Sequence, residues 1–93
     1  MLDVFMSSLF KRQKKKLTKE EIRVLDEEIK KIVTSPQIGE AKKGDLQGVY
    51  VYKFKVHRQE LLLAYEYDDY RLYLIMTGYH ENFYRDLKSY INL

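Results

Sequence analysis

The chain has 93 residues, which is enough for one hydrophobic core, so we expect residues 1–93 to form a single domain. It has no cysteine, which excludes a disulfide framework and a cysteine-based zinc site and suits a reducing compartment. The formal net charge is only +3, but the segment KRQKKK at residues 11–16 is strongly basic. Such a concentrated patch attracts polyanions, although a solvated helix face has the same composition.

We expect neither a secretory signal nor a membrane-spanning segment in this sequence. Its first residues, MLDVFMSSLF, contain Asp3 and no basic run ahead of the apolar residues, which is the wrong order for a secretory signal. The longest unbroken apolar run, LLLAY at residues 61–65, is far shorter than the roughly 20 residues of a membrane-spanning helix. We therefore expect a soluble, cytoplasmic protein that does not contact a membrane.

The first third of the chain predicts one weak strand and two helices. Residues 3–7 alternate weakly between apolar and polar, as a short strand would, and residues 7–17 are typical of a short helix. Thr18 and Glu21 have the spacing of a capping box. Apolar residues then recur at helical spacing, so residues 18–34 predict a second helix.

The rest of the chain predicts a loop, three strands and a closing helix. Glycines interrupt residues 35–47, which we expect to form a loop. The period then changes to two, and strands are predicted over residues 49–56, 61–67 and 70–77, joined by short turns. Residues 80–91 restore helical spacing. Two short connections in succession indicate an antiparallel meander.

These elements predict an α+β fold. It would contain a small antiparallel sheet, made of the three-strand meander and the short N-terminal strand, packed on one face by the two N-terminal helices. The C-terminal helix would close an edge or an end of the sheet. The second face would then stay available for function.

The available face of the first meander strand is unusual because it is basic. The alternation places the following side chains on it: Val49, Val51, Lys53, Lys55 and, beyond the strand, His57. Solvated lysines that block edge-to-edge aggregation are one interpretation. The other is a cationic surface for phosphates, with Tyr65, Tyr67 and Tyr73 offering rings for base stacking if they share this face.

The chain has two histidines, His57 and His80, whose side-chain type can donate and accept protons near neutral pH. A lone histidine is more often an ordinary surface or capping residue. Neither histidine lies in a metal-ligand spacing, so no metal site is predicted, and no nucleotide-binding glycine loop or serine triad suggests a cofactor. His80 and Tyr84 are four residues apart and would lie close together on the predicted last helix.

Several stretches together resemble the RelE/ParE superfamily of bacterial toxins from type II toxin-antitoxin modules. They are SPQIGEAKKGDLQGVYVYKFKV, LLLAYEYDDYRLYLIMTG and HENFYRDL. The resemblance covers nearly the whole chain and rests on the order of elements, on the GDLQG entry to the first meander strand and on the glycine-then-tyrosine ending. It implies a toxin that a cognate antitoxin holds in check by covering the basic face.

The RelE-like branch of this superfamily implies a ribosome-dependent endoribonuclease that cleaves mRNA in the ribosomal A site without a metal. By this resemblance, the catalytic candidates are His80, Tyr84, His57, Lys53, Lys55 and Arg71. The candidates for binding RNA are Lys11, Arg12, Lys14, Lys15, Lys16 and Arg58. Some members have an arginine where His80 stands, which shifts the implied proton transfer onto this histidine and leaves Tyr84 as a stacking or orienting group. The resemblance does not fix the general base.

Two alternatives remain open. The ParE-like branch shares the fold and is understood to poison DNA gyrase by binding, but its members generally lack the full set of proton-transfer residues. His57, His80, Tyr84 and the paired lysines therefore favour the nuclease. A non-catalytic RNA-binding module would need only the basic and aromatic groups and would leave both histidines unexplained.

Overall fold

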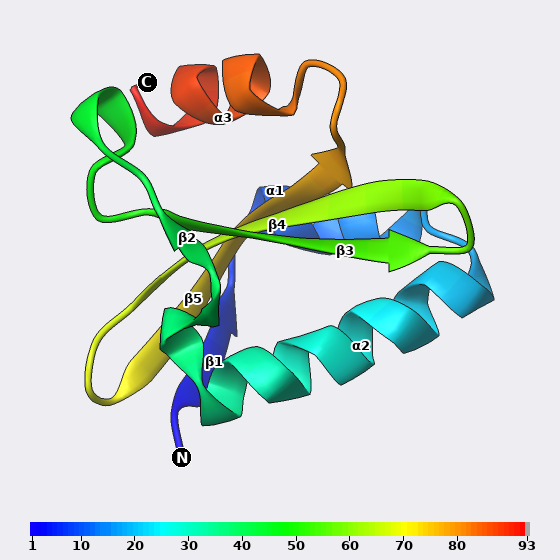
Figure 1. Cartoon of the computed structure of the whole chain (residues 1–93), viewed down its shortest axis with the longest axis horizontal. Helices are drawn as coiled ribbons and strands as arrows, with labels where there is room; N and C mark the ends of the chain where they lie inside the picture. Colours follow the sequence, from blue (N-terminus) through cyan, green and yellow to red (C-terminus); the bar gives the residue numbers. More distant parts are fainter. Residues whose placement is uncertain (93) are drawn as a thin grey trace.

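The computed structural model describes residues 1–92, which form a five-stranded sheet and three α-helices (Figure 1). In chain order these elements are β1 (Asp3–Met6), α1 (Ser8–Lys15), α2 (Lys19–Thr34), β2 (Glu40–Ala41), β3 (Tyr50–Val56), β4 (Gln59–Tyr67), β5 (Arg71–Tyr79) and α3 (Phe83–Ile91). Two short 3-10 helices, η1 (Pro36–Ile38) and η2 (Gly44–Leu46), flank β2. Within residues 1–92, no helix is long and apolar enough to cross a membrane.

The sheet has the strand order β1-β5-β4-β3-β2. The meander β3-β4-β5 is antiparallel as predicted, β2 adds an antiparallel strand to β3, and β1 pairs in parallel with β5. The predicted α+β fold and the short N-terminal strand are therefore confirmed. The prediction that residues 35–47 form only a loop is wrong, because β2 lies within this segment.

Strand β4 lies at the centre of the sheet and is covered on both sides. Its residues Leu61–Tyr65 are all fully buried. On the α2 side, the core contains Phe10, Leu25, Ile32, Phe54, Val56, Leu61, Leu63, Tyr65, Leu72 and Leu74. On the α3 side, it contains Leu46, Val49, Val51, Leu62, Ala64, Ile75, Met76, Phe83 and Leu87. Burying apolar residues on both faces explains why the β4 sequence is a continuous apolar run rather than an alternation.

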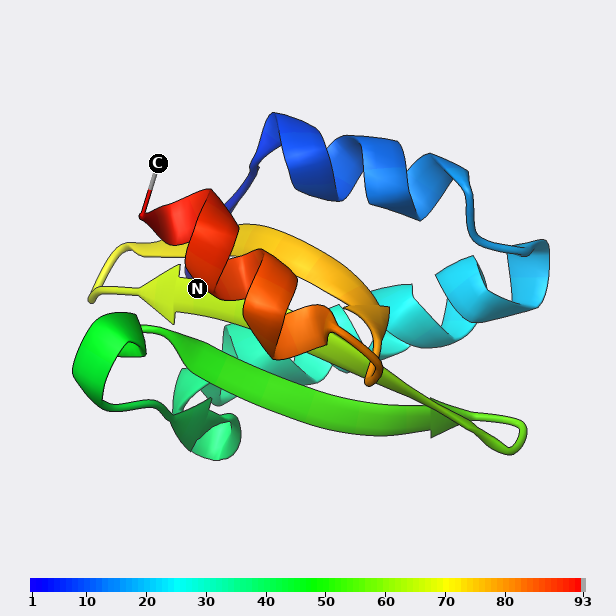
Figure 2. The same ribbon diagram turned by 90° about the horizontal axis from the view of Figure 1, so that it is seen from above.

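The last helix departs from the prediction in two ways. Helix α3 lies over the second face of the sheet (Figure 2), so this face is only partly available. The helix also begins at Phe83 rather than at residue 80, and Asn82 at its N-cap has a left-handed backbone with φ 63°. Asparagine tolerates this conformation better than most residues do. His80 therefore precedes the helix.

Helix α1 continues the edge that β1 begins. A bulge in the pairing of β4 with β5 leaves Ile75 between the paired residues Leu74 and Met76. The buried hydroxyl of Ser7, which also caps α1, donates to the carbonyl oxygen of Ile75 at 2.5 Å. Further along, Gln13 Oε1 accepts a hydrogen bond from Thr77 N at 2.9 Å. Side chains of the N-terminal segment thus satisfy backbone groups of β5 beyond the end of β1.

Helix α2 contributes a buried carboxylate, Glu28, to the contact with β3. Tyr52 donates a hydrogen bond to it at 2.7 Å, and Lys31 donates another at 2.7 Å. Burial works against ionisation of Glu28, but the hydrogen bonds from Lys31 and Tyr52 outweigh it, so the pKa of this carboxyl is lowered from 4.5. Burial and the neighbouring Glu28 raise the pKa of Tyr52 to about 12.

The Glu28 carboxylate predicts acid-dependent stability. Because its folded pKa lies below the unfolded value, its contribution is present above pH 4.5 and is lost as the pH falls through the folded pKa. Urea unfolding over a pH series should therefore show a steeper acid loss for wild type than for Glu28→Gln. Glu27→Gln, on the exposed side of the same helix, is the control and should keep the wild-type slope. Equal slopes for wild type and Glu28→Gln would contradict this account.

Tyr65 ties the segment before β2 to the core. Its ring is fully buried, and its hydroxyl donates to the carbonyl oxygen of Pro36 at 2.5 Å and accepts from Gly39 N at 2.9 Å. A β-carbon added at Gly39 would lie 2.4 Å from the Tyr65 hydroxyl oxygen. This close approach requires glycine at position 39.

Gly39→Ala should therefore lower the free energy of unfolding by about 1–3 kcal/mol, because it displaces the Tyr65 hydroxyl from its two partners. Chemical denaturation measures the loss. In a Tyr65→Phe background the obstructing oxygen is gone, so the same substitution should cost less than half as much. Equal costs in the two backgrounds would show that the close contact is not the cause.

Candidate functional site

Polar side chains from three parts of the fold lie on the α3 side of the sheet, along β2 and β3 and just beyond the end of β5. They are Glu40, Lys42, Lys53, Lys55, His80 and Tyr84, and we call them the basic cluster. Strand pairing fixes the rows of this surface: Lys53 lies opposite Leu62, which pairs with Gly78, and Lys55 lies opposite Glu60. His80 follows the end of β5 by one residue.

His80 and Tyr84 lie close together as predicted, although the helix does not begin where it was expected. The centroids of their rings are 6.2 Å apart in an edge-to-face arrangement. His80 sits in the turn before α3, where its carbonyl oxygen accepts a hydrogen bond from Phe83 N at 3.2 Å. The imidazole is exposed, so it is accessible to a ligand that lies over the sheet.

Lys42 joins this pair from the other side of Tyr84. Its Nζ atom lies 4.9 Å from the centroid of the Tyr84 ring, within the range of a cation–π contact. Its backbone N–H donates to Val49 O at 2.9 Å, which extends the β2–β3 pairing by one residue. An ion pair with Glu40 raises the pKa of Lys42, although partial burial works in the opposite direction.

Glu40 lies between two lysines. It pairs with Val51 across the β2–β3 ladder, so it shares a face with Lys53, its diagonal neighbour. The contact with Lys42 lowers the pKa of Glu40, and the charge of Lys53 adds a smaller effect of the same sign. Sequence reasoning missed Glu40 and Lys42 because it assigned them to a loop. Their spacing of two residues indicates a shared face only once the pairing with β3 is known.

The hairpin residues His57 and Arg58 lie outside the basic cluster. Strand β3 ends at Val56, and His57 adopts a left-handed backbone with φ 56° in the turn. The prediction that His57 continues the face of Lys53 and Lys55 is therefore wrong. Instead, His57 and Arg58 line a hollow with residues at the start of α2, among them Glu21.

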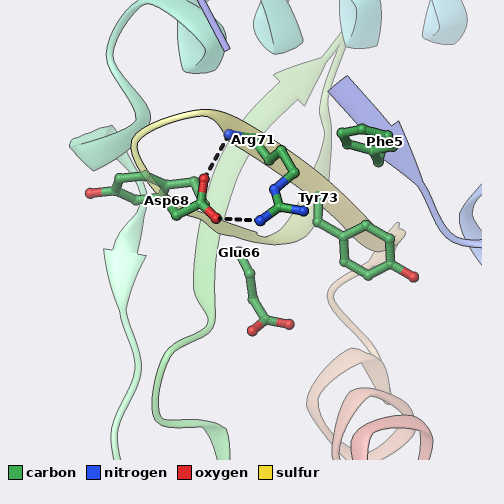
Figure 3. Close-up of a pocket in the computed structure, with 6 residues that line it drawn as sticks. Phe5, Glu66, Asp68, Arg71 and Tyr73 are labelled. Atoms are coloured by element: carbon green, nitrogen blue, oxygen red, sulfur yellow. Dashed lines mark hydrogen bonds and ion pairs between the residues drawn. The ribbon is translucent and has the colours of Figure 1, made fainter. Parts of the chain in front are cut away.

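Arg71 lies at the other end of β5 from His80. Strands rise about 3.3 Å per residue, so the nine residues of β5 separate Arg71 from the His80 turn by roughly 26 Å. Arg71 pairs with Asp68 at 3.5 Å and lines a pocket with the rings of Phe5 and Tyr73 (Figure 3). Of the tyrosines proposed for stacking beside the lysines, Tyr65 belongs to the α2-side core, and Tyr67 packs against that core.

The basic segment of α1 is also separate from the cluster. Lys11, Lys14 and Lys15 line a hollow with Met6 and with Ile22 of α2, at the edge of the sheet. Lys14 forms an ion pair with Asp26 at 2.7 Å, whereas Lys11, Arg12, Lys15 and Lys16 are exposed. Among residues 1–92, no group of three or more histidine, aspartate or glutamate side chains could hold a metal ion.

The fold is similar to that of several solved structures. A free-state mutant of the Escherichia coli toxin RelE superposes with a TM-score of 0.77 at 16% identity, covering 99% of this chain and 97% of that chain. The toxin-antitoxin complex RelBE of E. coli gives 0.71 at 19% identity, covering 87% and 99%. A conserved hypothetical protein of Helicobacter pylori gives 0.53 at 24% identity, covering 86% and 96%. The chain therefore has the fold of the RelE/ParE toxins.

The family assignment is more specific. Residues 4–88 match the family described as ParE-like toxin of type II bacterial toxin-antitoxin system. Because this match spans most of the chain, the protein belongs to that family. The resemblance that the sequence suggested is thereby confirmed. A comparison with curated proteins found no match.

The hydroxyl group of Tyr84 gives a test of whether this residue serves the fold or the site. It is buried and has no hydrogen-bond partner within residues 1–92. Tyr84→Phe should therefore leave the free energy of unfolding unchanged or raise it by up to about 1 kcal/mol. Tyr52→Phe, which removes a hydrogen bond to Glu28, is the matched control and should cost about 1–3 kcal/mol. If Tyr84→Phe and Tyr52→Phe lost equal free energy of unfolding in urea, the Tyr84 hydroxyl would have to make a stabilising hydrogen bond, which would contradict this prediction.

Proposed function

We propose that this toxin is a ribosome-dependent endoribonuclease that cleaves mRNA in the ribosomal A site without a metal ion. The observation that carries the proposal is the basic cluster, in which one histidine, one tyrosine and three lysines lie on the partly uncovered α3 side of the sheet. The similarity to RelE supports it at the level of the fold. We also propose that residues 1–93 form a single toxin domain.

Such a cluster can promote RNA cleavage by transesterification at a phosphodiester. The RNA 2′-oxygen would attack the adjacent phosphorus, forming one P–O bond while the bond to the 5′-oxygen breaks. The 2′-hydroxyl loses a proton and the 5′-oxygen gains one, and an imidazole such as that of His80 can mediate proton transfer near neutral pH. Lys53 and Lys55 would stabilise the negative charge that develops on the phosphate oxygens. Tyr84 would orient a base by contact with its ring.

The separate basic segment of α1 fits a supporting role in this proposal. Exposed lysine and arginine side chains attract RNA phosphates because binding releases counterions. Lys11 and Lys15 would thus hold the toxin against ribosomal RNA without touching the reacting phosphate. Contacts of His57, Arg58 and Arg71 with RNA remain predictions for surfaces outside the basic cluster.

A cognate antitoxin is the proposed regulatory partner. The chain is similar in fold to the toxin of the RelBE toxin-antitoxin complex, and its family is defined by type II modules. A partner that covers the basic cluster would block access of RNA to His80 and to the lysines. We expect acidic side chains in the covering segment, because the cluster presents more lysines than carboxylates.

The family description also favours a second candidate, inhibition of DNA gyrase by binding, because the matching family is called ParE-like. Binding alone would need a complementary surface and no proton transfer. The nuclease would require His80 for cleavage of mRNA, whereas a gyrase inhibitor would leave mRNA intact.

His80→Ala should reduce cleavage of mRNA on programmed ribosomes by a factor of 100 or more, which is the typical contribution of a general acid or base, about 10²–10⁴-fold. His57→Ala is the matched control, since it removes the other histidine outside the cluster, and should retain activity within about threefold. Circular dichroism would check that both variants stay folded. Loss of DNA supercoiling with intact messages would favour gyrase inhibition, and RNA binding without cleavage would favour a non-catalytic module.

A further inference from the structure

We propose that Lys42 is a phosphate-binding group of the basic cluster and that Glu40 occupies, in the free protein, the place that an RNA phosphate takes on binding. Glu40 would then be a built-in competitor for the substrate. This inference rests on the proposed function, because it concerns how the same cluster meets RNA.

The position of Lys42 suits a fixed cationic site. Its side chain is 20% exposed, and its Nζ atom lies 4.9 Å from the centre of the Tyr84 ring. The backbone of Lys42 is held by the hydrogen bond to Val49 O. A lysine fixed in this way loses less side-chain entropy when it binds an anion than a freely moving surface lysine does.

In the free protein, the carboxylate of Glu40 is the anion that binds the ammonium group of Lys42. The register with Val51 places Glu40 diagonally to Lys53 on the same face. Carboxylate and phosphate oxygens bind ammonium groups in similar ways, by charge-assisted hydrogen bonds. A phosphate of RNA approaching Lys42 and Lys53 therefore meets a position that a carboxylate already fills.

The carboxylate is also easy to displace. The Glu40 side chain is 68% exposed, so it can turn into solvent when a phosphate arrives. Ion pairs at such exposed positions contribute little free energy, and the corresponding competition reduces affinity by roughly two- to fivefold. The cluster would consequently bind RNA less tightly than its lysines alone would allow.

The test measures binding without cleavage. The probe is a short fluorescent RNA whose riboses are 2′-O-methylated, so that no free 2′-hydroxyl is present to attack, and affinity is read by anisotropy. Glu40→Gln keeps the shape of the side chain and should tighten binding roughly two- to fivefold. Lys42→Met keeps most of the side-chain length, should weaken binding, and should lower the salt dependence by about one counterion.

The double variant tests whether the two residues act together. Because Glu40 competes mainly for Lys42, the gain from Glu40→Gln should shrink to half or less in the Lys42→Met background. Glu27→Gln is the control for net charge, since Glu27 lies on the exposed side of α2, across the sheet from the basic cluster, where it pairs with Arg23. It should change affinity by less than about 1.5-fold.

Several outcomes would overturn the inference. Unchanged affinity of Glu40→Gln would do so, as would an equal gain from Glu27→Gln, or failure of the wild-type protein to bind the probe. Severe loss of ribosomal cleavage by Glu40→Gln with unchanged affinity would assign the carboxylate to proton transfer instead. Tighter binding by Glu40→Gln in a toxin that cuts no messages would leave this inference standing and reject the proposed nuclease.

Discussion

The structure depends on the burial of β4 from both sides. Five consecutive residues, Leu61–Tyr65, have no exposure to solvent, so helices must cover both faces of the sheet at its centre. Helix α2 supplies one cover and α3 the other. A 93-residue chain has few residues with which to build a second layer, and α3 is a helix of nine residues. It covers the apolar residues and leaves the lysine-bearing end of β3 uncovered.

The partial cover explains where the exposed lysines of the candidate site lie. Val49 and Val51, at the start of β3, belong to the core beneath α3, whereas Lys53 and Lys55 on the same face are exposed. The turn into α3 brings His80 to this boundary between covered and open sheet. The site is thus formed where the second apolar layer ends, and the same helix that completes the core also positions Tyr84.

Local signals were sufficient for most of the fold. The capping box at Thr18, the change to a period of two after Gly48 and the short turns of the meander each depend on neighbouring residues. The short strand β2 could not be predicted in this way, because a two-residue strand gains its stability from pairing with β3 and has no pattern of its own. The fully apolar run of β4 likewise indicated burial but did not show what would cover the second face.

The same distinction applies to the site. Spacing along one strand correctly placed Lys53 and Lys55 on one face, and spacing across one turn correctly placed His80 beside Tyr84. His57 was misplaced because alternation was extended past the end of a strand, where a left-handed residue turns the chain away. Glu40 and Lys42 were missed because their neighbours are distant in sequence, and only strand register shows them.

The hydroxyl of Tyr65 holds the backbone directly before the β2 residue of the basic cluster. It reaches from the centre of the sheet to Pro36 and Gly39, the residue directly before Glu40. Glu40 in β2 and Lys42 just after it are therefore set in place by a core residue rather than by the surface on which they lie. A change in the length of the chain between Gly39 and Lys42 would alter the register of these charges against β3. The arrangement of charges on this edge of the sheet is thus coupled to the packing of the core.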